Sequence, residues 1–345
     1  MRAIILSLSV VLAGCAGSTV STDDAPIERA LWTYVSVGED LRDRSCPDRI
    51  KFQTADALTL HAHEIDRGPE DARMKDISGL EIAGAWHLTS EESEFGGLSG
   101  LDVLDSGSLL AVTDDGKFVW IGIDPATGAP DGLGALAYMR DQDGDIFARK
   151  RDGDAEDLAV RDGLAFVSFE QDHRIQVYDL EGCGAAAHGA LLMKIDRVVD
   201  GNTLENNRGA EALSFAGDQL VVGFETRNLD GSPIGTLNED GTLTDVGRTN
   251  QPQLHLLTGM DRVNDITATL FRAYDPVRGA RGYVQVEDAD GPIAEARFRG
   301  DLPRDNFEGI AIGQNPSGGV RIWVISDDNF SDDQRTLLLA LDLTE

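Results

Sequence analysis

The sequence predicts an all-β fold, a β-propeller. A strand–turn–strand unit recurs along the chain, its first copies start about 55 residues apart, and its short apolar alternations are bounded by Gly, Asp and Asn. No stretch after residue 20 shows a sustained helical period. We favour six blades, with five as the other possibility, and an array of β-sandwiches is the alternative fold.

Each copy of the unit has a marked residue at the start of its first apolar run and an acid after its second run. The pairs are Ser99 and Asp114, Glu156 and Glu170, Glu211 and Glu225, and Glu308 and Asp327. The second and third pairs have equal separations along the chain. The first three copies follow one another at nearly equal intervals, whereas the last follows the third after almost twice that interval. We therefore expect one copy between residues 225 and 308 to have lost its signature.

The segment before these copies predicts a further blade. Trp86 and Leu88 alternate ahead of the glycine-rich turn at Gly96, so residues 76–103 read as the first blade.

Composition limits the partners of the protein. The 345-residue chain has a formal net charge of −31. Such an acidic surface repels nucleic acid and anionic membrane surfaces, so we exclude nucleic acid as a partner. An anionic substrate must then meet a local cation, either a metal ion or clustered arginines. We expect a monomer.

The N-terminus predicts export. Residues 1–14 contain one Arg and a short apolar run, which is typical of a signal peptide. The run is too short to span a bilayer. The ending Leu-Ala-Gly before Cys15 resembles a bacterial lipobox, which implies lipidation of Cys15 and a membrane anchor at the periplasmic face of the outer membrane. Residues 15–30 would be a tether and 31–345 the folded domain. An ordinary signal peptide is the alternative.

Two further cysteines, Cys46 and Cys183, remain in the exported chain. An oxidising compartment favours a disulfide between them. Two free thiols are the alternative, and their spacing is not that of a metal site.

The repeat predicts two groups of carboxylates, because equivalent positions of propeller blades face the same region. One group is Glu156, Glu211 and Glu308, and the other is Glu170, Glu225 and Asp327. Clustered carboxylates repel, so they either hold protons or bind a cation. Oxygen ligands without His or Cys favour Ca²⁺, with Mg²⁺ second. The equal alternative is architectural: the glutamates would accept backbone N–H bonds from neighbouring strands.

Basic residues lie within a few positions of the repeated acids. They are His173, Arg174, Arg208 and Arg227. Each alone is more often structural, but together they predict a clamp for a small anionic substrate. Nucleophilic catalysis is not supported, because the chain has no Gly-x-Ser-x-Gly elbow.

Four segments resemble a known family. They are DAEDLA from Asp154, NRGAEAL from residue 207, NFEGIAI from Asn306, and SDDNF from Ser326 with the closing TLLLALDL from Thr336. Over residues 75–344 they resemble the phytase-like domain family, described as "esterase-like activity of phytase". The resemblance implies an exported propeller that hydrolyses esters or phosphoesters, and it carries over no catalytic residue. Asp157 and Ala212 replace the glycine that usually follows the repeated Glu.

We therefore expect a lipid-anchored propeller that hydrolyses a small anionic ester with the help of a divalent cation. The alternative is a non-catalytic propeller that binds a component of the cell envelope.

Overall fold

The computed structural model describes residues 33–344 apart from 196–197, 200, 206–207 and 228–229. The predicted signal segment 1–14, the lipidation site Cys15 and the tether lie outside the described residues. Among the described residues, no helix has both the length and the apolar character needed to cross a membrane.

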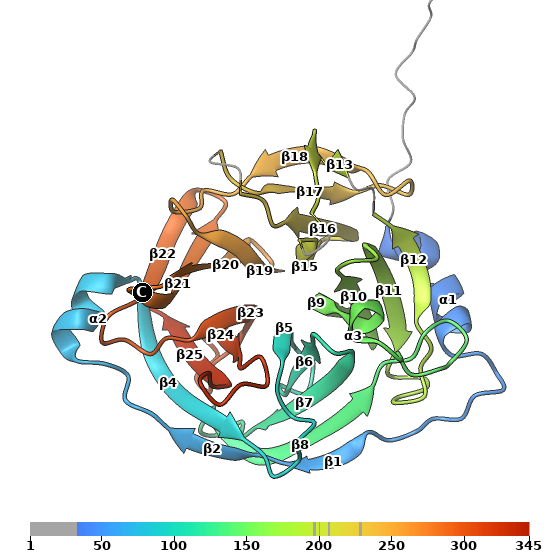
Figure 1. Ribbon diagram of the computed structural model, residues 1–345, viewed down its shortest axis with the longest axis horizontal. Coiled ribbons are helices and arrows are strands. Elements are labelled where there is room, and N and C mark those ends of the chain that lie inside the picture. The colour runs from blue at the N-terminus through green and yellow to red at the C-terminus, as the bar shows by residue number, and fades with distance from the viewer. Residues whose placement is uncertain (1–32, 196–197, 200, 206–207, 228–229, 345) are drawn as a thin grey trace, which may run out of the picture.

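Five β-sheets are arranged radially around one axis, as Figure 1 shows. The inner strands are β5 (Leu98–Val103), β9 (Ala155–Arg161), β15 (Ala210–Ala216), β19 (Leu256–Val263) and β23 (Asn306–Gln314). Each inner strand packs against the next, and β23 packs against β5, so the ring is closed. The predicted β-propeller is confirmed, with five blades and not the six that we favoured.

Each blade continues outward from its inner strand through antiparallel neighbours. Blade 1 adds β6 (Leu109–Thr113), β7 (Lys117–Ile123), β8 (Pro130–Tyr138) and β1 (Asp56–Thr59). Blade 2 adds β10 (Leu164–Phe169), β11 (Arg174–Asp179) and β12 (Ala190–Lys194). Blade 3 adds β16 (Gln219–Phe224), β17 (Pro233–Leu237) and β18 (Leu243–Arg248). Blade 4 adds β20 (Ile266–Asp275), β21 (Gly279–Asp288), β22 (Gly291–Phe298) and β3 (Ile77–Ser78). Blade 5 adds β24 (Val320–Asp327), β25 (Leu337–Leu343), β4 (Leu80–Thr89) and β2 (His61–Glu64).

The count of six was wrong because residues 76–103 do not form a blade. β4 pairs with β25 from Leu80↔Leu343 to His87↔Leu337, so the N-terminal part of the chain completes the C-terminal blade. β3 completes blade 4, and only β5 begins blade 1. Strands from the two ends of the chain thus share one sheet, which fastens the ring.

Smaller elements lie outside the blades. A hairpin of β13 (Val198–Val199) and β14 (Asn202–Thr203) follows blade 2, and α2 (Glu70–Asp76) and α3 (Lys150–Gly153) are short helices. The 12-residue helix α1 (Tyr34–Ser45) was not predicted. It buries Gly38, Leu41 and Ser45, a narrow face that leaves only a weak apolar period in the sequence.

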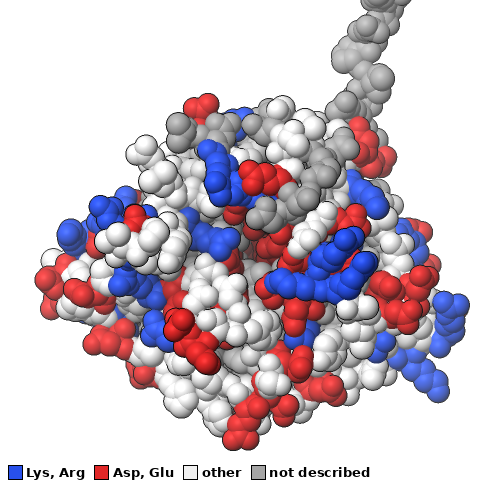
Figure 2. Space-filling view, viewed as in Figure 1, with Lys and Arg blue, Asp and Glu red and all other residues white. Residues whose placement is uncertain are grey.

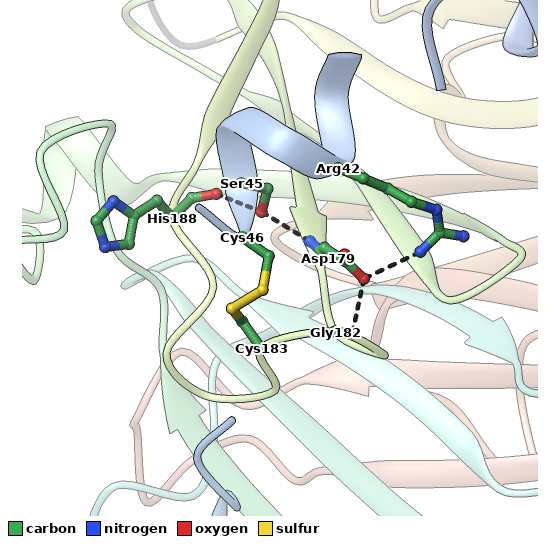
Figure 3. Close-up of a disulfide and its surroundings, with 7 residues drawn as sticks. All are labelled: Arg42, Ser45, Cys46, Asp179, Gly182, Cys183 and His188. Carbon is green, nitrogen blue, oxygen red and sulfur yellow. Dashed lines mark hydrogen bonds and ion pairs between the residues drawn. A yellow bond between two sulfur atoms is a disulfide. The ribbon is translucent and has the colours of Figure 1, made fainter. Parts of the chain in front are cut away.

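A disulfide attaches α1 to blade 2, as Figure 3 shows. It joins Cys46 to Cys183, the pair favoured by the sequence, with a Cα–Cα distance of 5.5 Å. Ser45 donates from Oγ to the carbonyl of His188 (2.7 Å) and accepts from the amide of Asp179 (2.8 Å). The cross-link joins positions 137 residues apart, so it restricts the unfolded state strongly.

The apolar core is divided among the blade interfaces. The described residues form five clusters, one between each pair of neighbouring blades. The cluster between blades 3 and 4 is the smallest and contains Ala212, Val221, Leu257, Met260, Phe271 and Tyr283. This interface therefore has the least apolar burial to hold it together.

Polar side chains near the axis join every pair of neighbouring blades. The amides of Val160, Leu213, Ile312 and Gly97 donate to the carboxylates of Asp102, Asp157, Asp261 and Asp328, respectively. The amide of Arg262 donates to Ser214 Oγ. The Asp157–Leu213 bond is 2.8 Å long and the Asp261–Ile312 bond 2.7 Å. These bonds satisfy buried amides where inner strands of different blades cannot pair as a sheet.

We expect Asp157→Ala to lower the free energy of unfolding by about 1–3 kcal/mol, because it leaves the buried amides of Leu213 and Leu158 without their acceptor. Asp105→Ala is the matched control, since Asp105 is exposed, and it should change stability by less than about 0.5 kcal/mol. Urea unfolding followed by circular dichroism measures both. Equal stability of Asp157→Ala and the wild type would contradict the assignment of Asp157 as a link between blades.

Candidate functional site

The marked residue of each repeat occupies a β-bulge at the start of an inner strand. The pairing of the inner strand with its neighbour shifts at Ser99, Glu156, Glu211, Thr258 and Glu308. A bulge redirects a side chain and bends its strand. The copy without a signature is therefore blade 4, in which Thr258 takes the place of the glutamate.

In each repeat, the second marked residue pairs with the residue that lies two positions before the bulge on the inner strand. In blades 1, 2 and 3 the amides of Asp114, Glu170 and Glu225 donate to the carbonyls of Gly97, Asp154 and Gly209. In blades 4 and 5 Leu256 pairs with Arg272 and Asn306 pairs with Asp327. The two predicted groups of acids are therefore brought to one end of the ring, where they form a single cluster. We call it the carboxylate mouth, and it comprises Asp114, Asp154, Glu156, Glu170, Glu211, Glu225, Glu308 and Asp327. Figure 2 shows acidic side chains around the centre of this face, with basic side chains beside them.

Three carboxylates of the mouth lie close enough to share a metal ion. One oxygen from each of Asp154, Glu156 and Glu170 lies within 4.8 Å of the other two. Oxygen ligands of Ca²⁺ lie about 2.3–2.6 Å from the ion, so two ligands of one ion can be that far apart. Asp154 was missed as a site residue, although it opens the DAEDLA segment two positions before Glu156.

An arginine occupies the acidic position of blade 4. Arg272 follows Thr258 at the same spacing that separates Glu156 from Glu170. Its Nη1 pairs with Glu308 Oε1 and donates to Asn306 Oδ1 (3.0 Å), and its Nη2 lies 3.8 Å from Glu225 Oε2. Arg272 is thus an internal counter-ion for the acids of blades 3 and 5. The same spacing could have identified it in the sequence.

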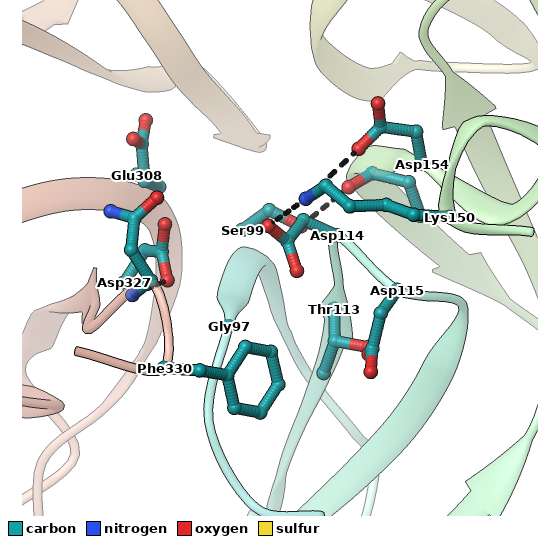
Figure 4. Close-up of polar contacts among 12 residues, drawn as sticks. Gly97, Ser99, Thr113, Asp114, Asp115, Lys150, Asp154, Glu308, Asp327 and Phe330 are labelled. Carbon is teal, nitrogen blue, oxygen red and sulfur yellow. Dashed lines mark hydrogen bonds and ion pairs between the residues drawn. The ribbon is translucent and has the colours of Figure 1, made fainter.

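Lys150 from α3 is a second cation at the mouth. Its Nζ pairs with Asp114 and lies 3.6 Å from Asp154 Oδ1. Figure 4 shows Lys150, Asp114 and Asp154 on one side, and Glu308 and Asp327 on the other. Asp114 Oδ1 is buried and has no hydrogen-bond partner in the described part of the chain. No repeat marks Lys150, because it comes from the connection between blades 1 and 2.

Burial raises the pKa of the clustered carboxyls, and repulsion between them adds to the effect. The pKa rises to about 9 for Glu170, about 8 for Glu211 and Glu308, and about 7 for Asp327. Burial and the neighbouring Glu211 also raise the pKa of Glu156 well above its usual range. Arg272 lowers the pKa of Glu308 and Glu211, but burial outweighs it. Several of these groups are therefore protonated at neutral pH unless a further cation compensates them.

The predicted basic ligands have different surroundings. Arg208 is buried and pairs through Nε with Glu225 Oε1 at 2.6 Å, so it neutralises one acid of the mouth. Arg174 donates to the carbonyls of Asp152 and Asp172 and stacks 4.0 Å from the centre of the Phe169 ring.

The other two predicted basic ligands differ in exposure. His173 is buried. Arg227 is exposed and lines a cavity beside the mouth. Of the four, Arg227 is the one that is exposed.

The architectural alternative applies to a different set of acids. The bonds that join the blades come from Asp102, Asp157, Asp261 and Asp328, which are not the repeated glutamates. Glu211 accepts a bond from the amide of Gly209 (3.2 Å) just before its own strand. The described residues provide no backbone donor to Glu156 or Glu308. Asp157, which replaces the usual glycine, uses that position to reach blade 3.

A family model matches residues 93–241: Phytase-like, "Esterase-like activity of phytase". Of the predicted 75–344, this match confirms the resemblance over 93–241, which contain β5 to β8 of blade 1, all of blade 2 and β15 to β17 of blade 3. No curated protein matches the chain in sequence.

Several solved structures resemble the chain at low identity. The PQQ-bound aldose sugar dehydrogenase of Streptomyces coelicolor is 12% identical over 76% of this chain and 97% of that one, with a TM-score of 0.42. The glutaminyl cyclase of Myxococcus xanthus is 14% identical over 77% and 97%, with a TM-score of 0.44. The endo-arabinase of Bacteroides thetaiotaomicron is 12% identical over 72% and 94%, with a TM-score of 0.43. At these values the likenesses transfer no activity to this protein.

Proposed function

We propose that the protein is an exported, lipid-anchored hydrolase that cleaves a small anionic ester, a phosphoester first, at the carboxylate mouth. Its cofactor would be a divalent cation, Ca²⁺ first and Mg²⁺ second, held by Asp154, Glu156 and Glu170. The observation that carries the proposal is the convergence of these three carboxylate oxygens within 4.8 Å. The match of residues 93–241 to an esterase-like family supports the class of reaction.

The chemistry of the mouth fits such a cation. Its proposed ligands are all carboxylates, with no His or Cys among them, which suits a hard ion. Their repulsion is relieved only in part by Lys150 and Arg272, so a further positive charge would be stabilised. When bound, the ion would polarise the ester and a water molecule.

The carboxyls of the mouth can supply both proton transfers of hydrolysis. The oxygen of a water molecule bonds to phosphorus, and the ester P–O bond breaks. The proton of that water passes to a carboxylate such as Glu308, and a second carboxyl that is still protonated and is not a ligand of the cation, such as Glu211, donates a proton to the leaving oxygen. A raised pKa suits both roles near neutral pH.

The non-catalytic alternative has support from the same residues. Lys150, Arg208 and Arg272 already pair with acids of the mouth, so the mouth could be a static ion-pair network that recognises an envelope component. The next experiment separates the two proposals.

We expect added Ca²⁺ to raise the melting temperature of the EDTA-treated protein, because a ligand of the native state stabilises it by about 2.7 kcal/mol at a hundred times its Kd. Glu156→Gln should weaken Ca²⁺ binding by about tenfold or more, since it removes one charged ligand. Glu239→Gln is the matched control, because Glu239 is exposed. Thermal melting and calorimetric titration measure these effects.

Hydrolysis is measured on the same samples with phosphoester and carboxylester substrates. The proposal predicts turnover that EDTA abolishes, and that Glu156→Gln lowers by about a hundredfold or more in kcat/KM, since positioned acids and metals contribute on this scale. Ca²⁺ binding without turnover of any ester would favour the binding propeller, and turnover unaffected by EDTA would contradict the role of the cation.

In EDTA, stability should fall as pH rises from about 5 to 9. The folded state holds protons on Glu211 and Glu308 up to a pKa of about 8 and on Glu170 up to about 9, whereas the unfolded state releases them near 4.5. The folded state thus binds more protons in this window, and the free energy of unfolding decreases with pH. Urea unfolding at three pH values measures the slope.

The double variant Glu211→Gln/Glu308→Gln should have a shallower slope, and Glu239→Gln should keep that of the wild type. Saturating Ca²⁺ should reduce the slope, because the charged carboxylates are then compensated. The same slope in the double variant and the wild type would show that these residues do not hold protons in the folded state.

A further inference from the structure

A cavity of about 870 Å³ opens beside the carboxylate mouth, next to the interface of blades 3 and 4. Arg272 and Asn306, which both bond Glu308, also line the cavity, so it adjoins the mouth directly. The blade interface here has the smallest apolar cluster and is bridged by the neutral side chain of Ser214. The cavity therefore opens beside the blade interface with the smallest apolar cluster.

Two further arginines, Arg227 and Arg281, line this cavity. Neither forms an ion pair with any carboxylate of the described residues, although the charge of Arg227 acts on Glu225 and that of Arg281 on Asp275. The Nε of Arg281 is buried without a hydrogen-bond acceptor in that same part of the chain. A buried donor without a partner is costly, and most such groups in proteins are satisfied.

The two acids that line the cavity already have partners within the protein. Asp305 pairs with Arg335 at 3.2 Å, and Asp275 accepts bonds from the amides of Val277 (2.8 Å) and Arg278 (2.9 Å). The lining therefore carries three arginines, Arg227, Arg272 and Arg281, against two aspartates, of which Asp305 is paired with Arg335.

We propose that this cavity is the substrate's anion subsite, in which Arg227 and Arg281 bind the oxyanion of an organic phosphate or carboxylate. The assignment to a substrate rests on the proposed hydrolase function. A guanidinium binds such a group through paired, charge-assisted hydrogen bonds. An anion held here places the adjoining part of the molecule toward Arg272 and the carboxylate mouth.

The size and the remaining lining indicate an organic anion larger than free phosphate. The volume lies within the range of small-molecule sites. Pro252, Leu254, Leu256 and Ala273 add apolar wall next to the arginines. Burial and the nearby Arg281 lower the pKa of His255, so its neutral ring adds a hydrogen-bonding group to this wall.

The test is calorimetric titration with phenyl phosphate, benzoate and inorganic phosphate in EDTA, which needs neither a cation nor turnover. We expect an organic anion to bind more tightly than inorganic phosphate. Arg227→Ala and Arg281→Ala should each weaken its binding by about tenfold or more, since each removes a charged donor. Arg281→Lys should bind with intermediate affinity, because it keeps the charge and loses the fork. Phenyl phosphate and benzoate distinguish the two oxyanions.

Arg278→Ala is the matched control, because Arg278 is exposed, lies close to Arg281 in the sequence and does not line the cavity. Equal weakening by Arg278→Ala, or no binding by the wild type, would overturn the subsite. Anion binding that depends on Arg227 and Arg281 without any turnover would support the subsite and reject the hydrolase. Turnover with a KM unchanged in both alanine variants would support the hydrolase and reject the subsite.

Discussion

The convergence of five bulged strands on one axis is the constraint on which the rest of this structure depends. The bulges at Ser99, Glu156, Glu211, Thr258 and Glu308 place equivalent side chains at one end of the ring, and the partner strands end there with a second set. When these positions carry acids, radial repetition itself produces a buried cluster of like charge. The repeat that forms the fold therefore also gathers the residues of the site, and it places like charges close together.

The positive charges that offset these carboxylates are distributed unevenly around the ring. Arg272 and Lys150 offset the acids of blades 5 and 1, and Arg208 offsets Glu225 of blade 3. Glu156 and Glu170 of blade 2 form no ion pair among the described residues, and together with Asp154, which lies 3.6 Å from Lys150, they are the three that can share one ion. Aspartates slightly further along the inner strands join the blades instead. The carboxylates that join the blades and the carboxylates proposed to bind the cation are therefore different residues at neighbouring positions.

The sequence predicted what periodicity encodes. The constant spacing was enough to pair Glu156 with Glu170 and Glu211 with Glu225, and the propeller brought them together. The blade count depended on β4 pairing with β25, a strand at the opposite end of the chain, which no local pattern reports. Arg272 has the spacing of the repeat but carries a positive charge, so a prediction based on repeated acids did not include it. Lys150 comes from a connection and Arg281 from the outer strand β21, and their positions depend on tertiary packing, whereas Arg227 was predicted because it lies close to a repeated acid in the sequence.

The most direct test of this account is to locate the cation. Crystals grown with Mn²⁺ in place of Ca²⁺ would be measured at a wavelength where manganese scatters anomalously. We expect a peak within bonding distance of Asp154, Glu156 and Glu170. A map without a peak among these three carboxylates, at saturating Mn²⁺, would contradict it and leave the mouth as an ion-pair network closed by Lys150, Arg208 and Arg272.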